Sequence, residues 1–155
     1  MGFLDKIMGL GGAKSDSKKQ EIRDIFNANV EGGDGYIVFA AMHMVQEKKL
    51  LKEVRTFYNY IIGYKDSSDP ELVIIATDHE LSDIGEPVRC KKSECTEAKY
   101  LEQTGSFTVT HPGLGSEPVD FAVIVSTAWG GYVIDVSCLD EFAPFAEFYQ
   151  NRFAK

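Results

Sequence analysis

The sequence predicts an α+β domain in which a mostly antiparallel sheet of about six to seven strands carries an amphipathic C-terminal helix. Three observations lead to this fold class. Runs of β-branched and aromatic residues recur between residues 36 and 138. Short turns separate neighbouring runs, which favours antiparallel pairing. A wide apolar stripe at helical spacing follows residue 140. An open α+β sheet with helices on one face is the alternative.

The first 19 residues differ in composition from the rest, which predicts an amphipathic segment and linker over 1–19 and a single domain over 20–155. Three glycines between residues 9 and 12 interrupt the segment, and small and charged residues follow them. An apolar stripe precedes these glycines. It is a candidate membrane contact, or it packs on the domain. Its members are Phe3, Leu4, Ile7 and Met8. A short helix is predicted over residues 20–29.

The first half of the sheet is predicted from three runs dominated by β-branched, aromatic and apolar residues, at 36–45, 54–65 and 72–77. Charged residues at 46–49 and a polar cluster at 66–70 predict the turns between these strands. Residues 88–92 alternate in polarity and predict an edge strand.

The second half begins with an ambiguous segment. Residues 93–103 begin with a serine and end before a glycine, signals that predict a short helix, with a strand as the open alternative. A strand is expected over 107–111. Two more are expected around Gly130-Gly131, a pair that favours a tight hairpin because such turns need positive φ. These two strands and the final helix are predicted over 119–129, 132–138 and 140–152.

The hairpin from Phe121 to Val136, followed directly by the helix from Asp140 to Arg152, ends a run of strands that starts at Tyr36. In this topology the chain resembles the pleckstrin-homology-like superfold, in particular its bacterial members. The resemblance implies a bent barrel capped by the last helix, without a catalytic centre, that binds lipids or peptides or forms oligomers. Lipid-binding members carry a basic cluster around the loop between the first two strands. Here that stretch contains Lys48, Lys49, Lys52 and Arg55, with a wider lysine-to-arginine spacing than in the family.

The net charge of −8 argues against a nucleic-acid partner, since binding to a phosphate backbone requires a basic face. The three cysteines are too few and too irregularly spaced for a disulfide framework, which indicates a reducing compartment. No stretch approaches the roughly 20 apolar residues of a spanning helix. We therefore expect a cytoplasmic protein, or one held peripherally at the inner membrane.

Few residues point to chemistry. His43, Asp78, His79 and Cys138 are the candidates for a small-ligand or enzymatic pocket. The sequence lacks a nucleophile elbow, a phosphate-binding loop and a dinucleotide fingerprint, so no catalytic residue and no cofactor is predicted. Asp78, His79 and Glu80 are consecutive, and consecutive side chains in an extended segment point apart, so no metal site is predicted either.

Aromatic residues give the strongest hint of a binding surface. Tyr58, Tyr60 and Tyr64 alternate onto one face of the second strand, and Trp129 lies at the expected hairpin tip. The sequence thus favours a non-enzymatic binding or assembly module that recognises a protein segment or a lipid surface. Its oligomeric state stays open. The alternatives are an acidic partner protein, of the secretion-chaperone or toxin-neutralising type, and a small-ligand pocket protein.

Overall fold

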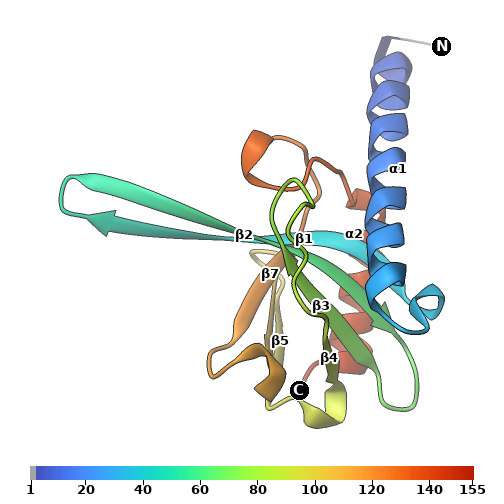
Figure 1. Ribbon diagram of the computed structural model, residues 1–155, viewed down its shortest axis with the longest axis vertical. Coiled ribbons are helices and arrows are strands. Elements are labelled where there is room, and N and C mark those ends of the chain that lie inside the picture. The colour runs from blue at the N-terminus through green and yellow to red at the C-terminus, as the bar shows by residue number, and fades with distance from the viewer. Residues whose placement is uncertain (1–2) are drawn as a thin grey trace.

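The fold is a single curled antiparallel sheet with one helix on each side of its strongly bent surface (Figure 1). The computed structural model describes the backbone of residues 3–155 and the side chains of residues 15–155. The strand order is β4-β3-β2-β1-β7-β6-β5, and all neighbours are antiparallel. The elements are α1 (Phe3–Asn29), β1 (Ile37–Lys49), β2 (Lys52–Lys65), β3 (Glu71–Thr77), β4 (Val88–Lys91), β5 (Glu97–Leu101), β6 (Ser106–Thr110), β7 (Val119–Val123) and α2 (Leu139–Phe148), which Tyr149–Phe153 continues as a π-helical turn. The predicted α+β class with a bent antiparallel sheet and a C-terminal helix is confirmed.

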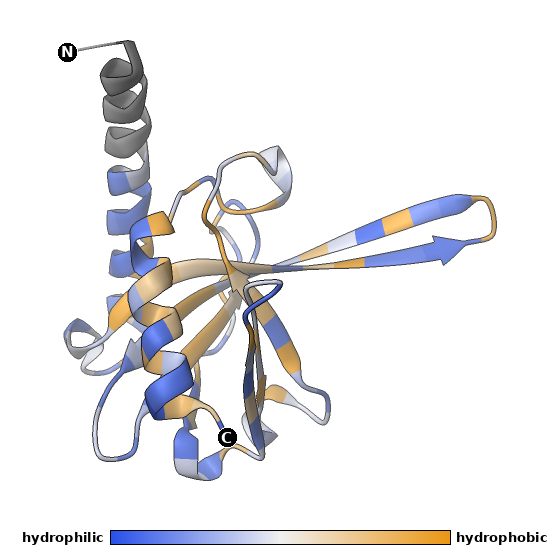
Figure 2. Cartoon of the chain, turned by 180° about the vertical axis from the view of Figure 1, so that it is seen from behind, coloured by the Kyte–Doolittle hydropathy of each residue, from blue (hydrophilic) through white to orange (hydrophobic). Residues whose placement is uncertain are grey.

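The core lies between the concave face of the sheet and α2, which crosses the hydrophobic inner parts of the strands (Figure 2). Aromatic rings fill this core. Phe145 of α2 is fully buried at its centre. Its ring centroid lies 4.6 Å from that of Phe39, 4.7 Å from that of Phe107 and 5.1 Å from that of Tyr64. Such distances are typical of favourable tilted ring pairs. The helix therefore closes the sheet through its apolar stripe, as the spacing of the sequence predicts.

The helix α1 packs against β1 and β2 on the other side of the sheet. Ile22, Phe26 and Val30 recur every four residues and are buried in this contact. The ring of Phe26 lies over Gly63 of β2, where a side chain would collide with it. Arg23 donates to the carbonyl oxygens of Gly33 and Tyr36, which fixes the turn between α1 and β1.

The expected interruption near the N-terminus is wrong at the level of secondary structure, because α1 runs continuously from Phe3 to Asn29. Its docked C-terminal part supplies the nucleus onto which further helical turns add cheaply, despite the glycines. Contacts also reach the segment expected as a linker. The backbone N–H of Ser137 donates to Ser15 Oγ, and Lys19 pairs with Glu141 at 2.8 Å. The side chains of Phe3, Leu4, Ile7 and Met8 lie outside the described ones. No helix within the described residues is long and apolar enough to cross a membrane.

The helix expected over 93–103 is also wrong. After a short 3-10 turn (Lys92–Glu94), the chain forms β5, which pairs with β6. Ala98 is buried and Tyr100 half-buried in the same core, so the segment alternates as a strand does. Ser93 lies within this turn and caps no helix, because its N–H and hydroxyl donate to Asp69. The expected edge strand over 88–92 is confirmed as β4, at one margin of the sheet.

The hairpin expected around Gly130-Gly131 does not form. β7 ends at Val123, and the described chain from there to α2 contains no strand, only a 3-10 turn (Gly130–Tyr132). Val133, Ile134 and Val136 are nevertheless buried. The β-like composition of this segment therefore reflects individual anchoring side chains that hold an irregular loop on the core.

Candidate binding arm and aromatic groove

The β1–β2 hairpin extends far beyond the rest of the sheet as a two-stranded arm, defined here as residues 43–58 (Figures 1 and 2). β1 pairs with β7 only as far as Met42, and β2 pairs with β3 only from Asn59 onward. Within the described residues, no backbone hydrogen bond joins either outer edge of the arm to another segment. The arm therefore presents two unpaired strand edges.

The tip of the arm is a two-residue turn, Leu50-Leu51. The charged turn expected over 46–49 is wrong, because these residues continue β1 in paired register with β2. Both leucines are completely exposed, at 106% and 102% relative accessibility. Leu50 also has φ +51°, a region that costs a residue with a Cβ about 1–2 kcal/mol. Of the two turn residues only Leu50 has a positive φ, and glycine is the usual residue at that first position. Exposed apolar side chains held on a strained backbone point to a functional element.

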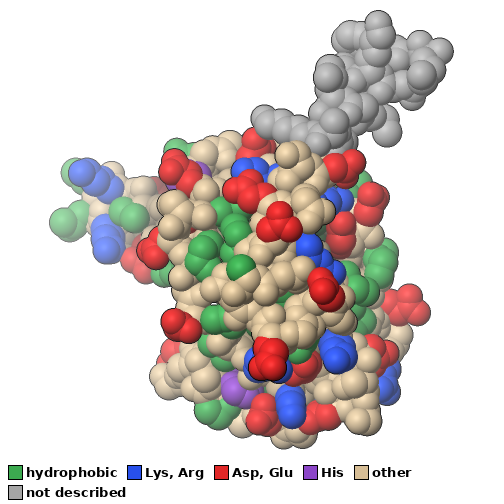
Figure 3. Space-filling view, turned by 45° about the vertical axis from the view of Figure 1, so that its right-hand side comes forward, with side chains coloured by type: hydrophobic (Ala, Val, Ile, Leu, Met, Phe, Trp, Pro, Cys, Tyr) green, Lys and Arg blue, Asp and Glu red, His purple; other side chains and the backbone are tan. Residues whose placement is uncertain are grey.

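The four basic residues expected as a cluster, Lys48, Lys49, Lys52 and Arg55, all lie on this arm and are exposed. The arm carries only two acidic residues, Glu47 and Glu53, and Lys49 lies 3.8 Å from Glu47. The arm is thus basic on a chain whose net charge is −8. Figure 3 shows hydrophobic and basic side chains together on this projection.

A groove of about 580 Å³ lies beside the base of the arm. Three aromatic rings form its wall: the ring of Phe57 stacks on Tyr132 at 4.9 Å and meets Trp129 edge-on at 5.9 Å. Tyr132 is 63% and Trp129 43% exposed, so the aromatic wall faces solvent. The lining residues are Glu53, Arg55, Phe57, Ala128, Trp129 and Tyr132.

The side chain of Asn59 on β2 holds the loop that forms part of the groove wall. This side chain is buried, donates from Nδ2 to the carbonyl oxygen of Tyr132 at 3.1 Å, and accepts at Oδ1 from the N–H of Ile134 at 3.0 Å. Two hydrogen bonds from one amide thus hold the loop that carries Trp129 and Tyr132 against β2. A single Asn inside the otherwise aromatic and apolar run 57–62 is the only sequence signal for this role.

The four aromatic residues expected to form one surface are separated in the structure. Tyr64 is buried and stacks on Phe148 at 4.7 Å, so it belongs to the core and to no exposed face. Tyr60 is half-buried, and this burial raises the pKa of its hydroxyl. Tyr58 is 46% exposed and stacks on His43.

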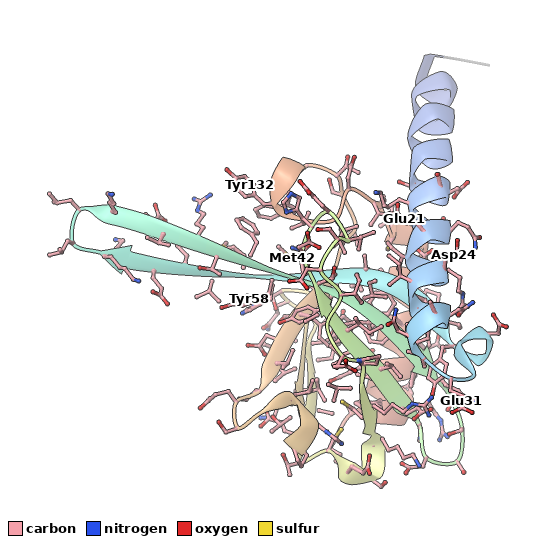
Figure 4. The ribbon with its side chains drawn as sticks, viewed as in Figure 1. Glu21, Asp24, Glu31, Met42, Tyr58 and Tyr132 are labelled. Atoms are coloured by element: carbon pink, nitrogen blue, oxygen red, sulfur yellow. The ribbon has the colours of Figure 1, made fainter. Side chains whose placement is uncertain are left out.

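Tyr58 and Tyr132 lie on opposite sides of the arm (Figure 4). This arrangement follows from the alternation of β2, which turns Phe57 toward Tyr132 and Tyr58 away from it. Of the four expected aromatics, Trp129 alone lines the groove, and its place is an irregular loop.

The candidates for chemistry have separate local partners. Asp78 accepts hydrogen bonds from the hydroxyl and N–H of Ser82 and from the N–H of Asp83, which lowers the pKa of its carboxyl. His79 lies 3.5 Å from Glu80 in the same loop, whereas His43 stacks on Tyr58 in the arm. Among the described residues, no group of three or more His, Cys, Asp or Glu side chains is placed to hold a metal ion.

The cysteine thiols are all buried. Cys138 Sγ accepts from the N–H of Ala40, and burial raises the pKa of this thiol to about 11. Burial also raises the pKa of Cys90 to about 12 and that of Cys95 to about 11. All three thiols are therefore protonated at neutral pH, the form that is a poor nucleophile.

Comparison with known proteins adds no relative. No family model, curated protein or solved structure matches the chain.

Proposed function

We propose that this protein is a non-enzymatic binding module of the cytoplasm that receives an extended protein segment at the arm and its aromatic groove. The observation that carries the proposal is an unpaired strand edge directly beside exposed aromatic rings. Strand addition to such an edge supplies main-chain hydrogen bonds, and side-chain pockets beside it supply specificity. A peptide-binding role also agrees with the pleckstrin-homology-like topology, which remains part of the proposal.

The chemistry of the groove supports a protein ligand. Aromatic residues and arginine are enriched where protein interfaces gain most of their energy. Phe57, Trp129 and Tyr132 offer a half-wet apolar wall, and Arg55 and Glu53 at its margin can pair with either charge on a bound segment. A segment with alternating apolar and charged residues fits this surface, because alternate side chains of a strand point to the same face.

Trp129 is the single tryptophan of the chain, so its fluorescence reports directly on the groove. We expect peptides selected from a displayed random library to shift Trp129 emission to shorter wavelength when they bind. Phe57→Ala should weaken this binding at least about tenfold, because it removes the centre of the aromatic wall. Thr56→Ala, an exposed neighbour on the opposite face of β2, is the matched control and should bind as the unmodified protein does. Equal binding by both variants, or no selected peptide, contradicts the proposal.

A second candidate is attachment to an anionic lipid surface through the tip of the arm. Two fully exposed leucines flanked by Lys48, Lys49 and Lys52 support it, since apolar insertion and electrostatic attraction add at such surfaces. The Leu50→Ser/Leu51→Ser variant should then lose co-sedimentation with phosphatidylserine vesicles, whereas Leu139→Ser, another exposed leucine, should keep it. Binding that instead depends on residues 1–18 would assign the contact to α1, which projects in a different direction from the arm (Figure 1).

A further inference from the structure

We propose that the segment bound at the arm is the arm of a second copy of this chain, with the two β2 strands paired antiparallel about Val54. This inference rests on the proposed function, because it names the protein segment that the same edge and groove receive. The result is an arm-exchanged dimer in which each tip lies against the groove of the other copy.

The sequence of the arm is complementary to itself in this register. Residues 50–58 read Leu-Leu-Lys-Glu-Val-Arg-Thr-Phe-Tyr. Around a two-fold axis at Val54, Glu53 of each copy faces Arg55 of the other. Lys52 faces Thr56, so no like charges meet. Opposite charges at directly paired positions stabilise antiparallel strands, and like charges there destabilise them.

The same register places the leucines at the tip of each arm opposite the aromatic residues at the base of the other arm. Leu51 of the second copy lies opposite Phe57, and Leu50 of the second copy opposite Tyr58. Leu50 and Leu51 are the two most exposed large hydrophobic side chains described, while Phe57 carries the groove wall. Pairing therefore covers both surfaces that the isolated chain leaves uncovered.

Among the described residues, the outer edge of β2 has no strand partner over residues 52–58. The first residue of β2 that pairs with β3 is Asn59, opposite Thr77. In the proposed register the second copy occupies the edge as far as Tyr58 and ends there, because Leu50 begins its turn. The second β2 strand thus continues the line of β3 without displacing any existing pair.

An isolated two-stranded ribbon is marginally stable in water, and it gains from additional strands. Exchange of arms converts two such ribbons into a four-stranded one. Charged side chains along an edge often serve to prevent such pairing. Here they do not oppose it, because Glu53 and Arg55 are placed to meet each other across the axis. The contact is small, so we expect association on the order of micromolar strength.

Sedimentation equilibrium of the full chain, from about 1 µM to about 1 mM, tests the dimer. We expect a concentration-dependent dimer, with Trp129 emission shifting to shorter wavelength in parallel. Arg55→Glu and Glu53→Arg each place like charges across the axis, so each variant alone should dimerise at least about tenfold more weakly. An equimolar mixture of the two variants should form a heterodimer, since positions 53 and 55 are both acidic in one variant and both basic in the other. Lys99→Glu, an exposed charge change on β5, is the control and should leave dimerisation unchanged.

Several outcomes overturn the inference. A monomer at all concentrations, dimerisation that survives both charge reversals, or a mixture that fails to associate would each exclude this register. Circular dichroism of each variant separates these results from loss of the fold. A monomer that still binds selected peptides at Trp129 leaves the proposed function intact and excludes the second copy as its ligand. A monomer that binds only phosphatidylserine vesicles excludes both and identifies the lipid surface as the occupant of the arm.

Discussion

Phe145→Ala is expected to lower the free energy of unfolding by about 3–5 kcal/mol, the range for removal of a fully buried aromatic side chain. The ring is 0% exposed and lies within 4.7 Å of the rings of Phe39 and Phe107 (centroid to centroid). These neighbours belong to β1, the central strand of the sheet, and to β6, which lies two positions further along it. Its removal therefore leaves a cavity at the point where α2 joins both halves.

Urea denaturation followed by far-UV circular dichroism measures this loss. The control is Leu139→Ala at the beginning of the same helix, where the side chain is 62% exposed and a change within about 0.5 kcal/mol is expected. A loss below roughly 1.5 kcal/mol for Phe145→Ala would mean that α2 contributes far less to the core than the ring contacts indicate.

Gly63→Ala should destabilise the protein by about 1–3 kcal/mol through overpacking. A Cβ at this position would lie 2.3 Å from Cζ and 2.5 Å from Cε2 of Phe26. Phe26 is completely buried and is the central docking residue of α1, so its ring cannot move aside without lifting the helix. Hydrogen exchange should consequently accelerate in α1 more than in β5 and β6.

The matched control is Gly35→Ala, where the nearest atom outside the neighbouring residues is 3.8 Å from the new Cβ. This substitution should be close to neutral. Combining Gly63→Ala with Phe26→Leu should recover part of the lost stability, because the smaller side chain frees space over β2. Equal effects of the two glycine substitutions would contradict the proposed seating of α1 on Gly63.

The central sheet could be predicted because its strands have to satisfy two strong local rules. The inner parts of β1 and β2 and all of β3 are dominated by β-branched, aromatic and apolar residues, whereas the charged ends of β1 and β2 hid the true length of their hairpin. The final helix likewise follows from one apolar stripe. Where local signals compete with tertiary contacts, the prediction fails. Residues 97–101 carry helix-like flanks, but pairing with β6 determines their structure.

The segment 132–138 shows the opposite error. Its apolar residues are buried although the segment is an irregular loop. A strand could bury the same residues, so the composition of the segment cannot distinguish a strand from a loop. The side-chain amide of Asn59, remote in sequence, fixes the actual path by binding the backbone at Tyr132 and Ile134. Long-range hydrogen bonds of this kind leave no periodic pattern in the chain.

The candidate site could be predicted only in part. The resemblance to the pleckstrin-homology-like superfold singled out Lys48, Lys49, Lys52 and Arg55, and Trp129 was noticed by its place beside two glycines. The sequence could not identify Phe57 and Tyr132 as groove residues. Whether a side chain of β2 is covered depends on the point at which the arm leaves the rest of the sheet, and the sequence does not show that point. Tyr64 and Tyr58 share an alternation face, yet α2 covers the first and leaves the second exposed. Tyr58 is exposed because it lies on the arm, whose β1 side pairs with β2 from His43 to Lys49 beyond the rest of the sheet.

The three buried thiols make the arm unusually easy to observe. Because every native cysteine is inside the core and protonated at neutral pH, a thiol-reactive dye or spin label has no native site to attack in the folded protein. A cysteine placed at the tip in exchange for Leu51 would be the single reactive group. The native cysteines therefore need not be replaced first. The position of the labelled tip can be followed spectroscopically while the core of the protein keeps its native sequence.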